Sequence, residues 1–364
     1  MHLQVKCTNC GRPYPEQGVP YRCQCGGLFD YAEPFHFDAQ EIEREQRGLW
    51  RYRAFFALPP QAVPITLGEG NTPLLSLEAF GKRMFAKCEF LQPTGSFKDR
   101  GTTTLVTFLK ARGVAVAVED SSGNAGASFA AYAARAGIRA RIFVPEGASG
   151  PKRKQIEAFN AEVITVPGAR SRAAEMAQAA ASAGITYASH AWLPFNLPGY
   201  ATLAYELVEQ LGEAPGSVIA PVGQGGLMLG MARGFEALRN AGLIKHMPRL
   251  IGVQAEACAP LVAVHRFGPL AVQWVRENPT LAEGVRVRTP LRGEKVLQAI
   301  QASDGDLLAI EEEEILPARD ALAQCGFHVE PTSALVWAAL AQIAQDLPEP
   351  IVLILTGAGY KVRI

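Results

Sequence analysis

The sequence predicts an α/β protein whose parallel sheets are covered on both faces by helices. Short apolar strands alternate with helical segments from about residue 113 onward, and turns of small residues follow several of these strands. Hydrophobic residues make up 48% of the chain and charged residues 19%, which is enough for a sizeable buried core. With 364 residues, the chain is long enough for roughly two domains.

The elements are expected in a regular order. A charged helical stretch at residues 41–47 and a proline-rich segment to residue 64 precede a loop at 67–75, which leads into a strand. Further strands are expected at residues 83–89, 114–119, 140–144, 164–166, 185–188, 217–221, 249–254 and 351–355. Helices are expected at residues 98–109, 124–136, 172–183, 202–211 and 226–238. The chain contains no internal repeat and no low-complexity tract.

Charge and hydropathy exclude several classes of function. Lys plus Arg equals Asp plus Glu at 35 each, so charge gives no reason to expect nucleic acid or a membrane surface as a partner. Apolar stretches are broken by Gly, Pro or charge well before the roughly 20 residues of a membrane-spanning helix. The first residues lack the apolar run of a signal peptide. We therefore expect a soluble cytoplasmic protein, in which seven cysteines are thiols or metal ligands rather than a disulfide framework.

The first 30 residues differ from the rest because they carry two cysteine pairs. A hairpin-length insert separates the pairs, which are Cys7 with Cys10 and Cys23 with Cys25. Four thiolates at this spacing can hold a closed, structural Zn²⁺ ion, although the second pair has one intervening residue instead of the usual two to four. A hairpin without metal is the alternative. The other cysteines are expected to be small buried apolar residues: Cys88, Cys258 and Cys325.

Residues 93–101, Pro-Thr-Gly-Ser-Phe-Lys-Asp-Arg-Gly, form the segment around which the chain is organised. They read as a turn followed by a helix that Ser96 or Asp99 could cap. A lysine in the first helical turn, beside Arg100, should have a lowered pKa because the helix N-terminus is partly positive. Such an amine, here Lys98, can form a Schiff base with an aldehyde. An ordinary surface lysine is the alternative reading.

Three loops of small residues follow predicted strands, where ligands bind in open parallel sheets. Residues 121–126 enter a helix whose amides can hold a carboxylate, and Asn124 there can bond a ring hydroxyl. Residues 223–226 can wrap a phosphate. Residues 356–359 present one hydroxyl, on Thr356. Each loop alone could be a simple tight turn, and the second lacks the Gly-x-Gly-x-x-Gly register of a dinucleotide site.

Together, an activated lysine, a phosphate loop, a carboxylate loop and a lone hydroxyl fit a pyridoxal phosphate site. With these motifs, the chain resembles the fold type II pyridoxal-phosphate enzymes, and among them the threonine synthase family. The resemblance covers residues 66–360 and implies two three-layer parallel-sheet domains beside the small N-terminal cysteine ribbon, which also looks like that of some members. It further implies a ribbon at residues 1–30, a large cofactor domain at 31–110 and 191–364, and a small mobile substrate domain at 111–190.

The resemblance also assigns residues. Lys98 would carry the cofactor as a Schiff base, with Phe97 beside its ring, Asn124 on its 3′-hydroxyl and Thr356 at the pyridine nitrogen. The cofactor phosphate would be held by Gly223, Gln224, Gly225, Gly226 and Leu227. The substrate carboxylate would be held by Ser122, Gly123, Asn124 and Ala125. A second anion site, for a phosphorylated substrate, would use Lys152, Arg153 and Lys154, or Arg170 and Arg172, unless these are solvated surface charges.

The implied reaction converts O-phospho-L-homoserine and water to L-threonine and phosphate, in a homodimer. Two departures affect the substrate: members commonly have Gly-Gln-Lys-Thr where this chain has Gly199-Tyr-Ala-Thr202, and many have His at Ala358. The alternatives are a threonine or serine dehydratase, or a β-replacement enzyme that forms cysteate or cysteine. A third, non-enzyme alternative is a binding or regulatory protein with the same fold. An intact Lys98 and phosphate loop argue against it.

Overall fold

The computed structural model describes residues 4–146, 150–168 and 170–362. Two compact units divide the chain, and both are discontinuous in sequence. Unit 1 comprises Met1–Gly70, Lys98–Gly199 and Val362–Ile364. Unit 2 comprises Asn71–Phe97 and Tyr200–Lys361. Each unit contains one sheet of mostly parallel strands, so the predicted α/β fold is confirmed.

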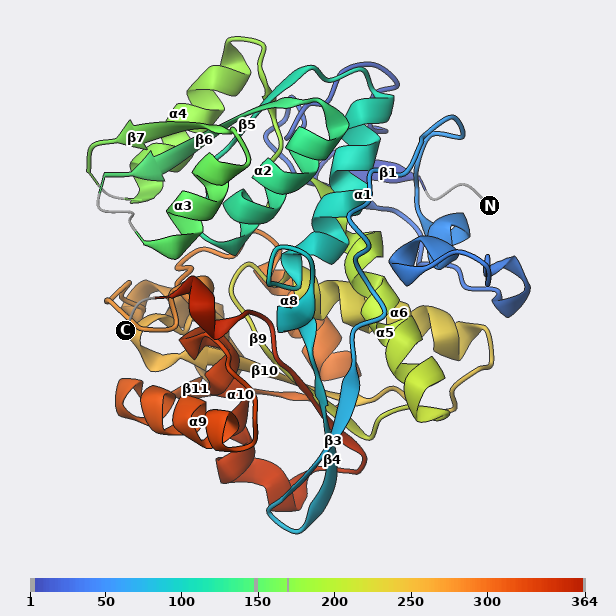
Figure 1. Cartoon of the computed structure of the whole chain (residues 1–364), viewed down its shortest axis with the longest axis vertical. Coiled ribbons are helices and arrows are strands. Elements are labelled where there is room, and N and C mark those ends of the chain that lie inside the picture. Colours follow the sequence, from blue (N-terminus) through green and yellow to red (C-terminus); the bar gives the residue numbers. More distant parts are fainter. Residues whose placement is uncertain (1–3, 147–149, 169, 363–364) are drawn as a thin grey trace. The chain divides into compact units, whose positions relative to one another are not determined.

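Unit 1 is built on a four-stranded parallel sheet in the order β7-β6-β5-β8. These strands are β5 (Val116–Glu119), β6 (Arg139–Pro145), β7 (Glu162–Val166) and β8 (Thr186–Tyr187). The helices α2 and α3 lie on one side of this sheet and α4 on the other (Figure 1). Their bounds are α1 (Lys98–Ala111), α2 (Asn124–Ala136), α3 (Pro151–Ala158) and α4 (Arg170–Ser182). The Ala-rich α2 ends at Gly137, which adopts the left-handed conformation that terminates helices.

The cysteine ribbon belongs to unit 1 and packs on its body through aromatic rings. Its strands β1 (Val5–Cys7) and β2 (Phe29–Tyr31) pair antiparallel. The Tyr14 ring meets Phe195 edge-on, with centroids 5.0 Å apart, and Phe195 stacks on Phe108 of α1 at 3.6 Å. Tyr21 of the ribbon packs against Tyr187 of β8, with ring centroids 5.1 Å apart. The ribbon is therefore part of the unit's core packing rather than a loose appendage.

Unit 2 is built on a six-stranded sheet in the order β11-β10-β9-β12-β4-β3. Its strands are β3 (Leu74–Ala79), β4 (Lys82–Lys87), β9 (Ser217–Pro221), β10 (Arg249–Ala255), β11 (Asp306–Ile310) and β12 (Ile351–Ile354). Every residue of the central strands β9 and β12 is buried, because helices cover both faces. The helices are α5 (Leu197–Leu211), α6 (Gly226–Asn240), α7 (Pro260–Phe267), α8 (Gly293–Ala302), α9 (Glu312–Gln324) and α10 (Pro331–Ile343).

One strand of unit 2 breaks the parallel pattern. The edge strand β3 pairs antiparallel with β4 through a two-residue turn at Phe80 and Gly81, whose φ values are +54° and +68°. Two positive φ values are typical of a type I′ hairpin turn, which matches the twist of the strands that it joins. This antiparallel edge pair stands beside the parallel pairs of the other strands, in keeping with the predicted parallel-sheet domain.

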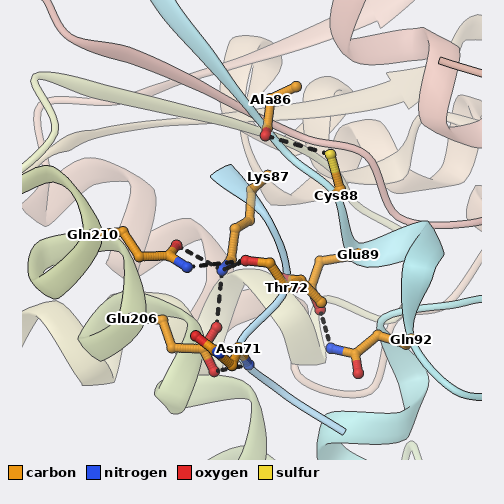
Figure 2. A network of polar contacts seen from close by, with 9 residues as sticks. All are labelled: Asn71, Thr72, Ala86, Lys87, Cys88, Glu89, Gln92, Glu206 and Gln210. Carbon is orange, nitrogen blue, oxygen red and sulfur yellow. Dashed lines mark hydrogen bonds and ion pairs between the residues drawn. The ribbon is translucent and has the colours of Figure 1, made fainter. Parts of the chain in front are cut away.

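A buried lysine ties β4 to the loop before β3 and to α5 (Figure 2). The Lys87 ammonium, 0% exposed, donates to Glu206 Oε2 at 2.9 Å, to Gln210 Oε1 at 2.8 Å and to the Thr72 carbonyl at 2.7 Å. The other oxygen of Glu206 accepts the Asn71 amide at 2.7 Å. A buried charge is tolerated when its donors are used in this way.

Two predictions about elements and burial are wrong. Residues 41–47 do not form a helix: a short 3₁₀ turn (Ala39–Glu41) precedes irregular chain, because the stretch has charge but only Ile42 to bury. Cys325 is exposed at the end of α9, whereas Cys88 and Cys258 are buried as expected. None of the helices in the described ranges combines the length and apolar content that crossing a lipid bilayer requires.

Candidate functional site

Lys98 is the first residue of α1, as predicted from its loop. The next two residues are fully buried, and Asp99 Oδ1 accepts a hydrogen bond of 2.6 Å from Ser128 of α2. This contact fixes the first turn of α1 against its neighbour. The predicted cap at Ser96 is wrong, because its buried hydroxyl makes no hydrogen bond within the described part of the chain.

The loop before α2 leaves the first amides of that helix without a side-chain cap. Gly123 occupies the N-cap position, and its amide bonds Ser121 Oγ at 3.2 Å. A side chain at Gly126 is excluded, since its Cβ would lie 1.8 Å from the Ser121 carbonyl oxygen. Uncapped amides at the start of a 13-residue helix can hold an anion such as a carboxylate. Ser122, Gly123 and Asn124 are half-buried around this site, and Ala125 is buried.

A carboxylate–imidazole pair that the sequence analysis does not predict lies at the base of this loop. Glu119 ends β5 and is 1% exposed; its Oε1 contacts His190 Nδ1 at 2.7 Å, and its Oε2 accepts the Ser121 amide at 2.5 Å. Burial raises the pKa of Glu119. The charge and hydrogen bond of His190, with smaller contributions from the Ser121 amide and Lys98, outweigh burial and lower that pKa overall.

In unit 2, the second small-residue loop enters α6 at Gly226. Gly225 is the N-cap, with a φ of +84°, and a Cβ there would lie 2.3 Å from Val296 Cγ2. A Cβ at Gly223 would lie 2.8 Å from the Gly284 carbonyl oxygen. The Gln224 side-chain oxygen accepts the Leu291 amide at 3.3 Å, which fixes the loop from outside. The loop therefore requires glycine and presents uncapped helix amides, as a phosphate cradle does.

The third loop follows β12, and its one hydroxyl, on Thr356, pairs with a hydroxyl of α10. Thr356 Oγ1 lies 3.0 Å from Ser333 Oγ of α10, and Ser333 Oγ also accepts the Gly357 amide at 2.9 Å. The Phe97 amide donates to the Thr356 carbonyl at 3.0 Å, so the residue before Lys98 is hydrogen-bonded to this loop. Sequence reasoning missed Ser333, since nothing in its helical surroundings marks a polar site.

Tyr200, one of the residues that depart from the threonine synthase pattern, lies beside two site residues of unit 2. Its ring is 5.5 Å from that of Phe97, with 46° between the planes. Its Cε2 would lie 3.4 Å from a Cβ added at Gly226. At 2% exposure the ring is buried beside the loop at residues 223–226.

The four N-terminal cysteines converge in space. Their sulfur atoms all lie within 4.8 Å of one another, and three pairs are 3.4, 3.5 and 3.7 Å apart. Sulfurs bound tetrahedrally at about 2.3 Å from zinc are separated by about 3.8 Å, so the cluster has the dimensions of a structural zinc site. The single residue between Cys23 and Cys25 does not prevent this geometry.

Two of the basic residues predicted for a second anion site form ion pairs within their own helices. Arg153 and Arg172 pair with glutamates of their own helices, Glu157 at 3.0 Å and Glu175 at 2.7 Å. Lys152 lies in the first turn of α3 and is half-buried, while Lys154 is exposed. The side chain of Arg170 lies outside the described residues.

The chain is similar to known proteins at the level of a family model, of single sequences and of a solved structure. The model of the family described as "Pyridoxal-phosphate dependent enzyme" matches residues 65–357. The threonine synthase of Methanocaldococcus jannaschii is 35% identical over 98% of this chain and 92% of its own. That of Mycobacterium tuberculosis is 35% identical over 85% and 87%. Among solved structures, a threonine deaminase from T.th. aligns with a TM-score of 0.69 at 30% identity, over 80% of this chain and 94% of its own.

Proposed function

Because the chain belongs to the family of pyridoxal-phosphate-dependent enzymes, we propose that it is a threonine synthase, which converts O-phospho-L-homoserine and water to L-threonine and phosphate. The observation that carries this proposal is Lys98 in the first turn of α1, in a chain similar to threonine synthases over 98% of its length. The non-enzyme alternative is disfavoured, since a binding protein has no need of this lysine.

The residues of the three loops fit pyridoxal phosphate. The glycine-requiring loop at residues 223–226 and the next residue, Leu227, would hold its phosphate, and Phe97 would lie beside its ring. Thr356, supported by Ser333 at 3.0 Å, would meet the pyridine nitrogen, and Asn124 the 3′-hydroxyl. When bound, the cofactor supplies an aldehyde that joins to amines and a ring that withdraws electrons from the substrate's α carbon.

Within this site, the chain's own groups hold the substrate and move protons. Residues 122–125, at the N-terminus of α2, would bind the substrate carboxylate. The Lys98 amine would remove the protons at the α and β carbons as a general base. Lys152, half-buried at the start of α3, would contact the substrate phosphate.

The dehydratase alternative has specific support. Threonine deaminase is a 30% identical neighbour, and Tyr200 and Ala358 depart from the threonine synthase pattern.

One observation favours the synthase instead. The His328 ring lies against the Thr356 turn, since a Cβ on Gly359 would be 2.6 Å from its Nε2. An imidazole is therefore present beside this turn although Ala358 is not a histidine, which favours the synthase. A β-replacement enzyme that forms cysteate or cysteine has no observation of its own in its favour.

Five further properties are part of the proposal. The sulfurs of Cys7, Cys10, Cys23 and Cys25 would bind Zn²⁺, supported by their mutual distances. The chain would act in the cytoplasm as a homodimer, without a nucleic-acid partner, in keeping with its balanced charge. Its functional division would be a large cofactor domain at residues 31–110 and 191–364 and a mobile one at 111–190.

Side-by-side assays separate the synthase from the dehydratase. The purified protein with added pyridoxal phosphate is given O-phospho-L-homoserine, L-threonine or L-serine, and kcat/KM is measured for phosphate and for keto acid. We expect a preference for O-phospho-L-homoserine of about 100-fold or more, since a site built for a charged group discriminates strongly against substrates that lack it. Keto acid from threonine or serine, without phosphate release, would contradict the synthase and favour the dehydratase.

A further inference from the structure

Glu119 and His190 connect the ends of two neighbouring strands of the unit 1 sheet. β5 and β8 pair in parallel, so Glu119 at the end of β5 and His190, three residues after β8, reach the same edge. A second contact crosses this edge, because Tyr187 donates to Asp120 Oδ1 at 2.8 Å. The His190 backbone is itself fixed, since its carbonyl accepts the Asn196 side-chain amide at 2.6 Å.

The Glu119 carboxylate divides its two oxygens between the imidazole and the loop. One accepts from His190 Nδ1 at 2.7 Å, and the other accepts the Ser121 amide at 2.5 Å. Ser121 in turn sets the course of the loop, because its hydroxyl bonds the Gly123 amide and its carbonyl oxygen lies against Gly126. A single chain of contacts therefore runs from His190 to the N-terminus of α2.

We propose that Glu119 and His190 are positioning residues that hold the substrate loop, residues 121–126, in its binding conformation. His190 directs the carboxylate through its Nδ1–H, and the carboxylate directs the loop through the Ser121 amide. The role of the loop as the substrate's carboxylate site rests on the proposed function, but the positioning of its backbone does not. In this role His190 contributes one N–H donor and no proton transfer.

Amide hydrogen exchange of the full chain with pyridoxal phosphate tests this positioning directly. His190→Leu removes the donor, whereas His190→Asn retains an N–H close to the place of Nδ1. We expect exchange at residues 120–126 to rise about 10-fold or more in His190→Leu and to stay within about threefold of wild type in His190→Asn. The matched control is His265→Asn, since His265 pairs with Asp306 at 3.2 Å in unit 2. The His265→Asn variant should show the same amide exchange at residues 120–126 as wild type.

Three results would overturn the proposal. The first is unchanged exchange at residues 120–126 in His190→Leu. The second is an increase that spreads over β5 and α2, which would assign the pair to the stability of the whole unit. The third is failure of His190→Asn to retain protection of the loop. Glu119→Ala, which removes the acceptor, repeats the test if His190→Leu does not fold, and it must show the same local increase.

A kinetic measurement links the loop to the substrate. In His190→Leu, KM for O-phospho-L-homoserine should rise about 10-fold with a smaller fall in kcat, because the loop would act on binding. His190→Asn should restore KM; an equal loss of kcat in both variants would instead mean proton transfer by the imidazole and would overturn the positioning role. If wild type does not turn over O-phospho-L-homoserine, the proposed function fails, and the exchange result still decides the role of His190.

Discussion

Lys98 follows a tightly bonded turn and begins a helix whose next two residues are completely buried. The turn and the buried residues fix the position of the Lys98 backbone. Only the conformational freedom of the Lys98 side chain itself is therefore lost when its amine binds a ligand. A surface lysine held by no such framework would lack this advantage. At the scale of single residues, Lys98 is therefore the group on which we propose that the chemistry depends.

Lys98→Ala should remove the visible absorbance that the protein acquires with pyridoxal phosphate. The alanine has no amine to join to the aldehyde, while the glycine loop at residues 223–226 is untouched and should still bind the phosphate. Absorbance spectroscopy after removal of free cofactor measures this. Lys110→Ala, at the exposed end of the same helix, is the control and should keep the absorbance. A coloured Lys98→Ala protein would show that another amine holds the cofactor.

Which site residues could be predicted depends on how local their signal is. Lys98, Asn124 and the glycines at 223–226 stand in short motifs whose turn chemistry is readable from neighbouring residues. Glu119 and His190 are 71 positions apart, and only the pairing of β5 with β8 brings them together. Without knowledge of that pairing, each looks like an ordinary polar residue at the end of a strand.

The strand β4 shows how one side chain can hold an element in place. Lys87→Met should lower the free energy of unfolding by about 3–5 kcal/mol, because it leaves the Glu206 carboxylate buried without its cation. Lys82→Met, on the same strand, removes a partly exposed pair with Glu349 at 3.7 Å and an exposed hydrogen bond to the Gln345 carbonyl at 3.3 Å, and it should cost less than about 1 kcal/mol. Denaturant unfolding of both variants measures the difference. Equal costs would contradict the assigned role of the buried network.

Helices and strands could be predicted where the hydrophobic pattern or the flanking turn signals were clear, and not where the pattern was uniform or a turn had an uncommon residue. β9 was predicted with its observed bounds, since five apolar or small residues stand between turn signals. The helix α10 was not predicted, because it is apolar on nearly every side and so has no amphipathic period. The hairpin turn at Phe80 was missed because a bulky residue at positive φ is uncommon.

At the scale of the whole molecule, the cysteine ribbon should couple metal binding to stability. Removal of zinc by a chelator should lower the melting temperature by several degrees, because the ribbon packs on Phe195 and Tyr187 of unit 1 and would lose its fixed shape. Calorimetry with and without chelator, together with metal analysis, measures the effect. Cys325→Ser, at an exposed cysteine outside the cluster, should respond to chelator as wild type does. A metal-free protein with an unchanged melting temperature would contradict a zinc site.

Stability should also depend on pH through Glu119. The pKa of Glu119 in the folded state lies below the ordinary value of 4.5. Ionised Glu119 therefore stabilises the fold fully at pH values above the pKa that Glu119 has in the unfolded chain. This contribution is lost as the pH falls through the folded-state pKa. The difference in unfolding free energy between wild type and Glu119→Gln should therefore shrink from pH 7 towards pH 3. A difference that does not change with pH would contradict the ionised pair.

The most direct test of the account is the stoichiometry of the proposed reaction. The protein with pyridoxal phosphate is mixed with O-phospho-L-homoserine, and phosphorus and proton NMR follow phosphate and the organic product in one sample. We predict that phosphate and L-threonine appear in equal amounts, and that Lys98→Ala forms neither. Phosphate accompanied by a keto acid instead of threonine, or no reaction of the cofactor-loaded protein, would contradict the threonine synthase function.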